Sequence, residues 1–382
     1  MNMKICYVTH LSKLSGAANS LLDLLDALDF NEYEPFVITN SRGGLVDELE
    51  KRGIRYAIVP YAPATNSEDM VKNIGKRAMN TNALNFLSVK AIEHVLKKEK
   101  IDIVHNNSYL SGAGMEAARN LGIPYICHLR DFIWEDHHRT FINKTLMHEL
   151  LYDADRVIAV SESVREKFAN ISRKEIEVIH DGIKTSEYRL PEREILCGKQ
   201  INIVLVGRVA PGKGQMDAIR AVRIVSKNTD IPVFLHLCGN IGDKRYFERM
   251  RDYIENHKIG YVTIHDFTND LTQIRGISDI GLTCSKSEAL GRVTVENMLS
   301  SMLVIGADTC GTTEIIRDGE NGLLYPAGDY HALADVIMRA IEDPENSNKM
   351  RAESYAEAVT YDNKEYARKI TDVYRSMMRS QS

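Results

Sequence analysis

Long apolar runs, paired cysteines and an excess of basic residues are all missing from this 382-residue sequence. No uninterrupted apolar stretch approaches the roughly 18 residues that a membrane-spanning helix needs. The N-terminal MNMKICYVTH reads directly as a strand, without the layout of a signal peptide. The net charge of −5 provides no basic character that would suggest nucleic acid as a partner. These absences predict a globular protein of the cytoplasm.

The six cysteines are scattered, and none forms a CxxC pair. They are Cys6, Cys127, Cys197, Cys238, Cys284 and Cys310. Most lie within or beside apolar runs, where a free thiol behaves as a small hydrophobic group. The pattern predicts reduced thiols and argues against both disulfides and a zinc site.

Apolar, strand-like runs alternate with amphipathic segments along the whole chain. MKICYVTH, IDIVHNN, INIVLVGR and MLVIGAD are such runs, and ANSLLDLLDALD is one of the helical stretches. Continuous apolar runs separated by helices are typical of parallel sheets buried on both faces. We predict an α/β protein of two Rossmann-like domains that face each other across a cleft, where the carboxyl ends of their strands meet.

A polar stretch, TSEYRLPEREILCGKQ, interrupts the alternation near the middle of the chain and sets the predicted domain boundaries. The first domain is residues 1–184, the polar linker is 185–200, and the second domain is 201–360. The last helix, within 361–382, lies outside the second sheet and is expected to pack back on the first domain.

Two loops in the predicted second domain carry charges at strand ends. VLVGRVAPGKGQMDAI places Arg208 and Lys213 around a glycine-rich turn before a helix, which suits an anionic ligand such as a diphosphate. The spacing is not that of a Walker A motif, and a solvated basic loop is the alternative. SEALGRVTVENM places Glu288 in a strand-to-helix loop and Glu296 on the early face of the helix. Acidic residues are also common at helix starts without any function.

Two loops in the predicted first domain complete the set. HLSKLSGAANSLL places Gly16 where a helix begins, so backbone N–H groups can approach a phosphate or sugar. It lacks GxGxxG, and a plain helix-start turn is the alternative. PYICHLRDF places His128, Arg130 and Asp131 at a strand end, although a lone histidine is more often structural than catalytic.

These fragments together resemble a GT-B glycosyltransferase, similar to glycosyltransferase family 4. The E-x7-E signature appears as EALGRVTVENM, and the arginine and lysine of the GR-x4-K loop fall on Arg208 and Lys213. CGTTEIIRDGENGLLY is similar to the family's glycine-rich passage. The order and spacing of the fragments carry the resemblance, which covers both halves and is most specific from Gly207 to Asp329.

The resemblance implies a role for each candidate residue. Glu296 would bind the ribose hydroxyls of a nucleotide, and Glu288 the transferred sugar. The donor-binding residues would also include Gly16, Leu290, Gly291 and Arg292, through backbone groups, and Phe267 at the base. Arg208 and Lys213 would stabilise charge on the departing diphosphate, and His128 would line the sugar–acceptor site.

The implied activity is that of a retaining hexosyltransferase of polysaccharide biosynthesis. It would move a sugar from a nucleotide-sugar donor, a UDP-sugar by default, to a glycan or lipid-linked glycan. No cofactor and no metal are expected, because cations and a helix terminus would serve the diphosphate. The DxD spacing of Asp153 and Asp155 lies before a strand, at the wrong end for the active site.

Two other functions fit the same resemblance. A GT-B-like sugar-nucleotide 2-epimerase shares fold and ligand, but the E-x7-E pattern argues against it. A non-catalytic nucleotide-sugar-binding subunit would tolerate the loss of His128 or Lys213, yet both are present.

Residues 51–100 carry ten Lys or Arg residues against four acidic residues. Within them NALNFLSVKAIEHVL can form an amphipathic helix, and such basic surfaces bind anionic headgroups. A peripheral contact with the inner face of the membrane is therefore one interpretation. The alternative is a solvated basic face on an ordinary packed helix.

Overall fold

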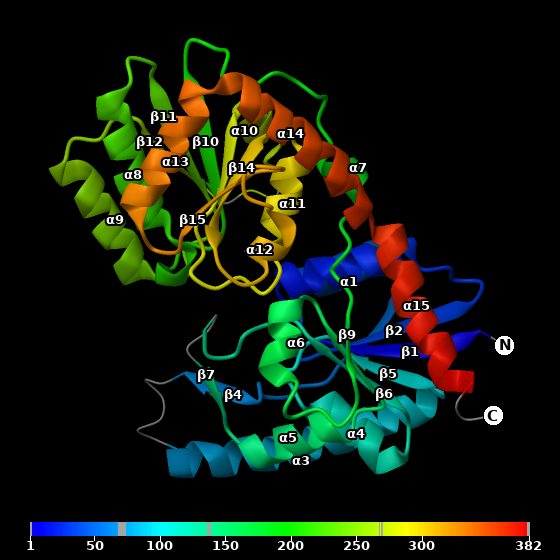
Figure 1. The fold of residues 1–382 in the computed structure, drawn as a ribbon. Coiled ribbons are helices and arrows are strands. Elements are labelled where there is room, and N and C mark those ends of the chain that lie inside the picture. Colours follow the sequence, from blue (N-terminus) through cyan, green and yellow to red (C-terminus); the bar gives the residue numbers. More distant parts are fainter. Residues whose placement is uncertain (1, 68–73, 136–138, 267, 269, 380–382) are drawn as a thin grey trace. The chain divides into compact units, whose positions relative to one another are not determined.

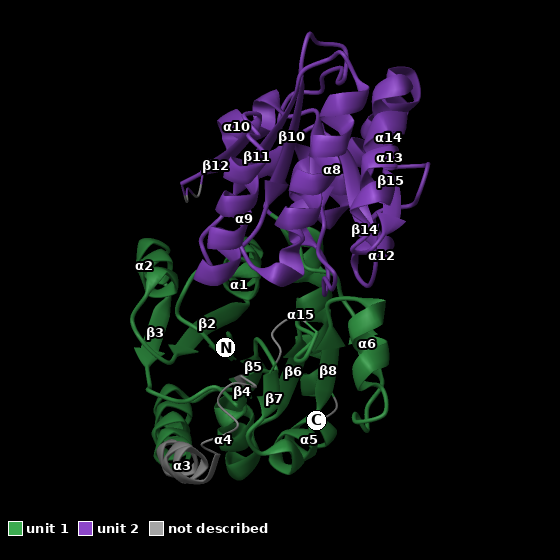
Figure 2. Cartoon of the chain, turned by 90° about the vertical axis from the view of Figure 1, so that its left-hand side faces the viewer, with its two compact units in different colours: residues 1–183, 363–382 green, residues 184–362 purple. Residues whose placement is uncertain are grey.

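The computed structural model describes residues 2–67, 74–135, 139–266, 268 and 270–379, without the side chains of 67 and 74–84. The chain forms two compact units (Figure 2). The first joins residues 1–183 to 363–382, and the second comprises 184–362. Each unit is built on its own parallel sheet covered by helices (Figure 1), which confirms the predicted pair of α/β domains.

The sheet of the first unit has seven parallel strands in the order β3-β2-β1-β5-β6-β8-β9. They are β1 (Met3–Val8), β2 (Tyr33–Thr39), β3 (Arg55–Ile58), β5 (Ile103–Asn106), β6 (Tyr125–Leu129), β8 (Arg156–Ala159) and β9 (Ile176–Val178). A separate antiparallel pair is formed by β4 (Thr65–Ser67) and β7 (Arg139–Phe141). The interior strand β1 pairs with β2 on one side and β5 on the other, and it is buried along Ile5–Val8.

Helices connect these strands, as parallel pairing requires. They are α1 (Gly16–Ala27), α2 (Gly44–Lys51), α3 (Ile74–Glu99), α4 (Ala113–Leu121), α5 (Lys144–Tyr152) and α6 (Glu162–Phe168). In α1, the Ser15 hydroxyl accepts a hydrogen bond from the Ala18 amide at 3.4 Å and caps the first turn. In the part of the chain that the structure describes, no helix combines the length and apolar character that crossing a bilayer requires.

The last helix, α15 (Asn363–Arg379), belongs to the first unit although it follows the second in sequence (Figure 2). It packs against α1, and its apolar side is part of the first unit's core. The helix residues in that core are Tyr366, Ala367, Ile370, Val373, Tyr374 and Met377. A stripe at spacings of three and four residues explains why this segment forms a helix that docks on one face.

The sheet of the second unit has six parallel strands in the order β12-β11-β10-β13-β14-β15. They are β10 (Ile201–Val206), β11 (Val233–Cys238), β12 (Val262–His265), β13 (Ile280–Thr283), β14 (Leu303–Asp308) and β15 (Leu323–Pro326). The α-helices are α7 (Thr185–Tyr188), α8 (Gln215–Asn228), α9 (Lys244–Asn256), α10 (Thr272–Ile277), α11 (Arg292–Leu299), α12 (Thr312–Ile315), α13 (Tyr330–Glu342) and α14 (Pro344–Ala358). Going along the chain, the strands are added on one side of β10 as far as β12, and then on its other side from β13 onward. The strand order therefore reverses between β10 and β13, and open α/β sheets bind ligands at such a reversal.

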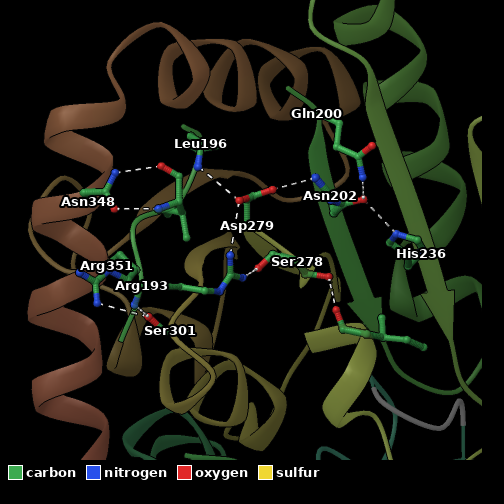
Figure 3. A network of polar contacts seen from close by, with 12 residues as sticks. Arg193, Leu196, Gln200, Asn202, His236, Ser278, Asp279, Ser301, Asn348 and Arg351 are labelled. Atoms are coloured by element: carbon green, nitrogen blue, oxygen red, sulfur yellow. Dashed lines mark hydrogen bonds and ion pairs between the residues drawn. The ribbon is translucent and has the colours of Figure 1, made fainter. Parts of the chain in front are cut away.

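Residues 185–200, expected as a linker, instead belong to the second unit. Ile195 and Leu196 are buried in that unit's core. The Asp279 carboxylate accepts hydrogen bonds from the amides of Leu196 and Asn202 at 3.2 and 2.9 Å (Figure 3). The Asn348 side chain accepts a hydrogen bond from the backbone amide of Ile195 and donates one to the backbone carbonyl of Ile195. A polar sequence can therefore be ordered, because these side chains satisfy its backbone groups.

We predict that Gly182→Ala weakens the docking of α15. A Cβ at this position would lie 2.5 Å from the Tyr366 Cβ and 2.7 Å from the Asn363 Cα. The free energy of unfolding should fall by about 1–3 kcal/mol, the usual cost of overpacking. Urea denaturation measures the change. Gly260→Ala is the control, since its Cβ would meet no atom within 4 Å; equal stability of both variants would contradict the prediction.

Candidate active site

The loops that follow β10, β13 and β14 in the second unit are locked together at two glycines. Gly214 has φ +70°, and a Cβ there would lie 2.2 Å from the carbonyl oxygen of Cys284. A Cβ at Gly311 would lie 2.5 Å from the carbonyl oxygen of Ala289. Because neither position has room for a side chain, the three loops meet backbone to backbone at the carboxyl ends of their strands.

The loop after β10 carries the two cations expected at the diphosphate. A single turn of 3₁₀ helix, η2 (Pro211–Lys213), leads into α8, and the Lys286 amide donates to the Gly212 carbonyl at 3.0 Å. Arg208 is exposed, while its carbonyl accepts a bond from the buried Gln215 side chain at 3.0 Å. The loop therefore has a fixed backbone and presents the Arg208 guanidinium to solvent.

Lys213 and Glu288 form a direct ion pair. The Lys213 Nζ lies 2.6 Å from the Glu288 Oε2, and both side chains are partly exposed. The family resemblance implies that these residues bind different parts of a ligand, Lys213 the phosphate and Glu288 the sugar. The structure adds that the two charges are in contact before any ligand is considered. One ligand bound here would be able to contact both.

The N-terminus of α11 follows directly after Glu288. Gly291, with φ +94°, is the N-cap, and Arg292 is the first helical residue. The side chain of Leu290 is buried, so at this residue only backbone groups are available to a ligand. The first N–H groups of a helix have no partner within the helix and favour an anion. The predicted backbone contacts of residues 290–292 are therefore stereochemically reasonable.

Glu296 lies one turn further along α11 and is only 8% exposed. Its carboxylate accepts a hydrogen bond from Arg275 Nη2 at 2.5 Å. Arg275 comes from α10 and was not among the residues predicted from the sequence. No motif surrounds it in LTQIRGIS, and its proximity to Glu296, 21 residues further along the chain, arises only in the folded structure.

His128, expected to line the sugar–acceptor site, is fully buried within β6 of the first unit. Its Nδ1 lies 3.0 Å from the Nε2 of His105 and 3.2 Å from a guanidinium nitrogen of Arg130. Burial, together with the neighbouring Arg130 and His105, holds the pKa of His128 well below its usual value. The imidazole is therefore neutral, it is enclosed as are all residues of β6, and its place beside the sugar and the acceptor stays a prediction.

Gly16 is the first residue of α1 and is exposed, and a Cβ there would meet no atom within 4 Å. Packing of the unit therefore does not require glycine at this position. Phe267, the candidate for the base pocket, lies outside the described residues. Just before it, His265 and Asp266 line a cavity of about 530 Å³ with Asn240, Ile241 and Phe247.

The DxD pair has structural partners in the first unit. Asp153 lies 3.2 Å from Arg119, and Asp155 accepts a bond from the Tyr125 amide at 2.9 Å. Across the described ranges, no group of three or more His, Cys, Asp or Glu residues is placed to hold a metal ion.

Comparisons with known proteins identify both halves of the chain. Residues 14–187 match the family model of Glycosyltransferase Family 4, and residues 190–357 match that of Glycosyl transferases group 1. The chain is 24% identical over 328 residues to an uncharacterised glycosyltransferase of Methanocaldococcus jannaschii, covering 84% of this chain and 79% of that protein. It is 23% identical to the UDP-Gal:alpha-D-GlcNAc-diphosphoundecaprenol alpha-1,3-galactosyltransferase of Escherichia coli, covering 89% and 88% of the two chains.

Solved structures show the same fold. The crystal structure of Anabaena Alr3699/HepE in complex with UDP has a TM-score of 0.81 and 23% sequence identity, covering 98% of this chain and all of the other. Its complex with UDP-glucose has a TM-score of 0.80. Together with the two family models, this fold defines a GT-B glycosyltransferase. The chain is an enzyme of this class resembling glycosyltransferase family 4, with a family 4 domain followed by a group 1 domain.

Proposed function

We propose that this glycosyltransferase moves a hexose from a UDP-sugar to a glycan or lipid-linked glycan with retention of anomeric configuration. The relatives support the donor and the type of acceptor, since one is named for UDP-galactose and a diphosphoundecaprenol-linked sugar, and HepE was crystallised with UDP-glucose. Retention rests on the resemblance of EALGRVTVENM to the E-x7-E signature.

The observation that carries the proposal is the Lys213–Glu288 ion pair beside the N-terminus of α11. A nucleotide sugar has a negatively charged diphosphate next to a neutral, hydroxyl-rich sugar. The loop cluster has a matching group for each part. A cation and helix N–H groups suit the diphosphate, and a carboxylate, which only accepts hydrogen bonds, suits the sugar hydroxyls. In the proposed complex the Lys213 ammonium contacts the diphosphate, while the Glu288 carboxylate accepts hydrogen bonds from the sugar hydroxyls.

The reaction breaks the bond between the anomeric carbon and the phosphate oxygen, and an acceptor hydroxyl forms the new bond on the same face. The hydroxyl proton passes to the departing phosphate. Negative charge grows on the nucleoside diphosphate, where Arg208, Lys213 and the backbone of 290–292 stabilise it. Glu296 binds the ribose hydroxyls, and the cavity before Phe267 receives the base. Gly16 and His128, which the resemblance assigns to the donor and to the sugar–acceptor site, belong to the first unit.

Catalysis without a metal is part of the proposal. Arg208, Lys213 and the helix terminus together provide positive charge at the place where a divalent cation would otherwise act. Two alternatives compete with glycosyl transfer: a sugar-nucleotide 2-epimerase and a non-catalytic nucleotide-sugar-binding subunit. An epimerase converts the donor without an acceptor, and a binding subunit converts nothing.

The proposed activity is tested by incubating the protein with UDP-, GDP- and ADP-sugars, with and without oligosaccharide or lipid-linked acceptors. We expect acceptor-dependent release of UDP, unchanged by EDTA, and a product whose proton NMR coupling shows the donor's anomeric configuration. Epimerised donor in the absence of acceptor would support the epimerase instead. Activity that is lost with EDTA and restored by Mg²⁺ or Mn²⁺ would contradict the metal-free mechanism.

Lys213→Ala should lower kcat by about 10²-fold, because the lost charge acts most strongly on the transition state. Steady-state kinetics with a saturating UDP-sugar measures the effect. Lys349→Ala is the matched control, since Lys349 is also paired with a glutamate, at 2.8 Å, but lies on the exposed surface of α14. A fall in kcat of less than about threefold for Lys213→Ala would argue against its role at the diphosphate.

We also propose that α3 contacts an anionic membrane surface. Phe86 and Leu87 are 63% and 66% exposed, and the exposed cation Lys97 follows at helical spacing on the same side. Lys90 is also exposed there, with its ammonium 2.8 Å from the Glu93 carboxylate. Exposed apolar residues beside cations are typical of helices that lie in the membrane interface. The cations Lys72, Lys76 and Arg77, which belong to the same basic stretch, lie outside the part of the chain whose side chains are described.

Replacing Phe86 and Leu87 with Ser should reduce sedimentation with vesicles of phosphatidylcholine and phosphatidylglycerol, because the helix loses the apolar groups that enter the interface. Rising salt should release the unmodified protein. Ile277→Ser, which changes an exposed apolar residue of the second unit, is the control. Sedimentation that does not depend on lipid charge, salt or the two substitutions would favour a solvated basic face and a soluble acceptor.

A further inference from the structure

Glu296 is a buried carboxylate, although binding a ligand does not by itself require burial. It is 8% exposed, and the Arg275 guanidinium contacts its Oε2 at 2.5 Å. Taking a carboxylate out of water is costly unless a cation and hydrogen bonds offset the loss of hydration. Arg275 provides both, so the depth at which Glu296 sits depends on this one partner among the described contacts.

Arg275 is itself held in a fixed position. It is 5% exposed in the last turn of the short helix α10, and its guanidinium carbon lies 5.0 Å from the centre of the Tyr188 ring. Tyr188 is hydrogen-bonded to the end of α11, the helix that carries Glu296. Its carbonyl accepts a hydrogen bond at 3.1 Å from the hydroxyl of Ser300, the C-cap of that helix. The next contact along the chain, from the Leu190 amide to the Leu299 carbonyl, is 3.0 Å. Arg275 thus has an aromatic ring against its guanidinium and a carboxylate at its edge.

This arrangement leaves Glu296 able to bind two hydroxyl groups. An ionised carboxylate has about four acceptor positions, of which the hydrogen bond from Arg275 uses one. A ribose with two neighbouring hydroxyls needs two. The ion pair therefore orients the carboxylate without exhausting its capacity, and a side chain that is already oriented loses less rotamer freedom when the ligand binds.

We propose that Arg275 is a positioning residue that holds Glu296 in the orientation that binds the ribose hydroxyls of the donor. The inference rests on the proposed function, in which Glu296 contacts the ribose. Arg275 does not touch the reacting atoms. It acts through Glu296, and the Tyr188 ring keeps the guanidinium in place. The competing explanation is an ion pair that stabilises the second unit and has no effect on ligand recognition.

Pairs of nucleotides that differ by one hydroxyl separate the two explanations. Calorimetry with UDP, GDP and ADP, each compared with its 2′-deoxy form, measures how strongly the enzyme recognises the hydroxyl. For the unmodified protein and its preferred base, we expect the ribose form to bind about tenfold more tightly. In Arg275→Met this ratio should fall to about twofold or less, because Glu296 is no longer oriented. Arg275→Lys keeps the charge without the planar guanidinium, so its ratio should be intermediate.

Kinetics provide a second measure, because ribose binding is the same before and during reaction. Arg275→Met should raise KM for the nucleotide sugar by roughly tenfold while kcat changes less than about twofold. The matched control is Arg351→Met, which removes another buried arginine paired with a carboxylate, that of Glu192 at 3.1 Å. It should lower thermal stability and leave the ribose-to-deoxyribose ratio unchanged.

Each outcome decides between the explanations. An unchanged ratio in Arg275→Met, or in Arg275→Lys if the first variant does not fold, would overturn the positioning role while leaving the proposed function intact. An unmodified protein that binds none of the nucleotides, or does not distinguish the two sugars, would overturn both. In a Glu296→Ala background, Arg275→Met should cause no further loss of affinity; an additional loss would show that Arg275 does not act through Glu296.

Discussion

The backbone contact between Gly214 and Cys284 is the constraint on which the rest of the site depends. The two loops approach so closely that any Cβ at Gly214 would overlap the Cys284 carbonyl, and the backbone there has a left-handed φ that favours glycine. This contact places Lys213 opposite Glu288. It also aligns the loop after β10 with the start of α11, so that cation, carboxylate and helix terminus share one small region of the second unit.

Both glutamates of the E-x7-E signature are paired with cations, but in different surroundings. Glu288 meets Lys213 in a partly exposed setting, where a ligand can rearrange the pair at small cost. Glu296 meets Arg275 in a buried setting, where removing either partner would leave an uncompensated charge. In the proposed function, the first pair lies at the diphosphate, whose charge changes during the reaction. The second binds neutral hydroxyls that must only be held in place.

The first unit uses its buried polar groups differently. His105 bonds to the Tyr374 hydroxyl at 2.7 Å, so a strand of the sheet is joined to the helix α15 at the far end of the sequence. Tyr366 of the same helix accepts a bond from Arg130 at 2.8 Å. Burial, with a smaller contribution from Arg130, lowers the pKa of His105 to about 3, so the imidazole is neutral at physiological pH. These contacts make the returning helix part of the domain rather than an appendage.

The sequence alone determined the fold class, because continuous apolar runs separated by helices are satisfied only by parallel sheets covered on both faces. It also indicated which loops carry Arg208, Lys213, Glu288 and Glu296, since strand ends and helix starts follow from local pattern.

Tertiary structure decided what local pattern cannot express. Ile195 enters a core because Asp279 and Asn348 satisfy the polar backbone around it, so the expected linker is ordered. His128 is enclosed within a strand whose residues are all buried, and Arg275 meets Glu296, 21 residues further along the chain, only in the folded structure. Contacts between residues far apart in sequence depend on tertiary packing. They cannot be predicted from the composition of either segment, because each segment could pack against many others.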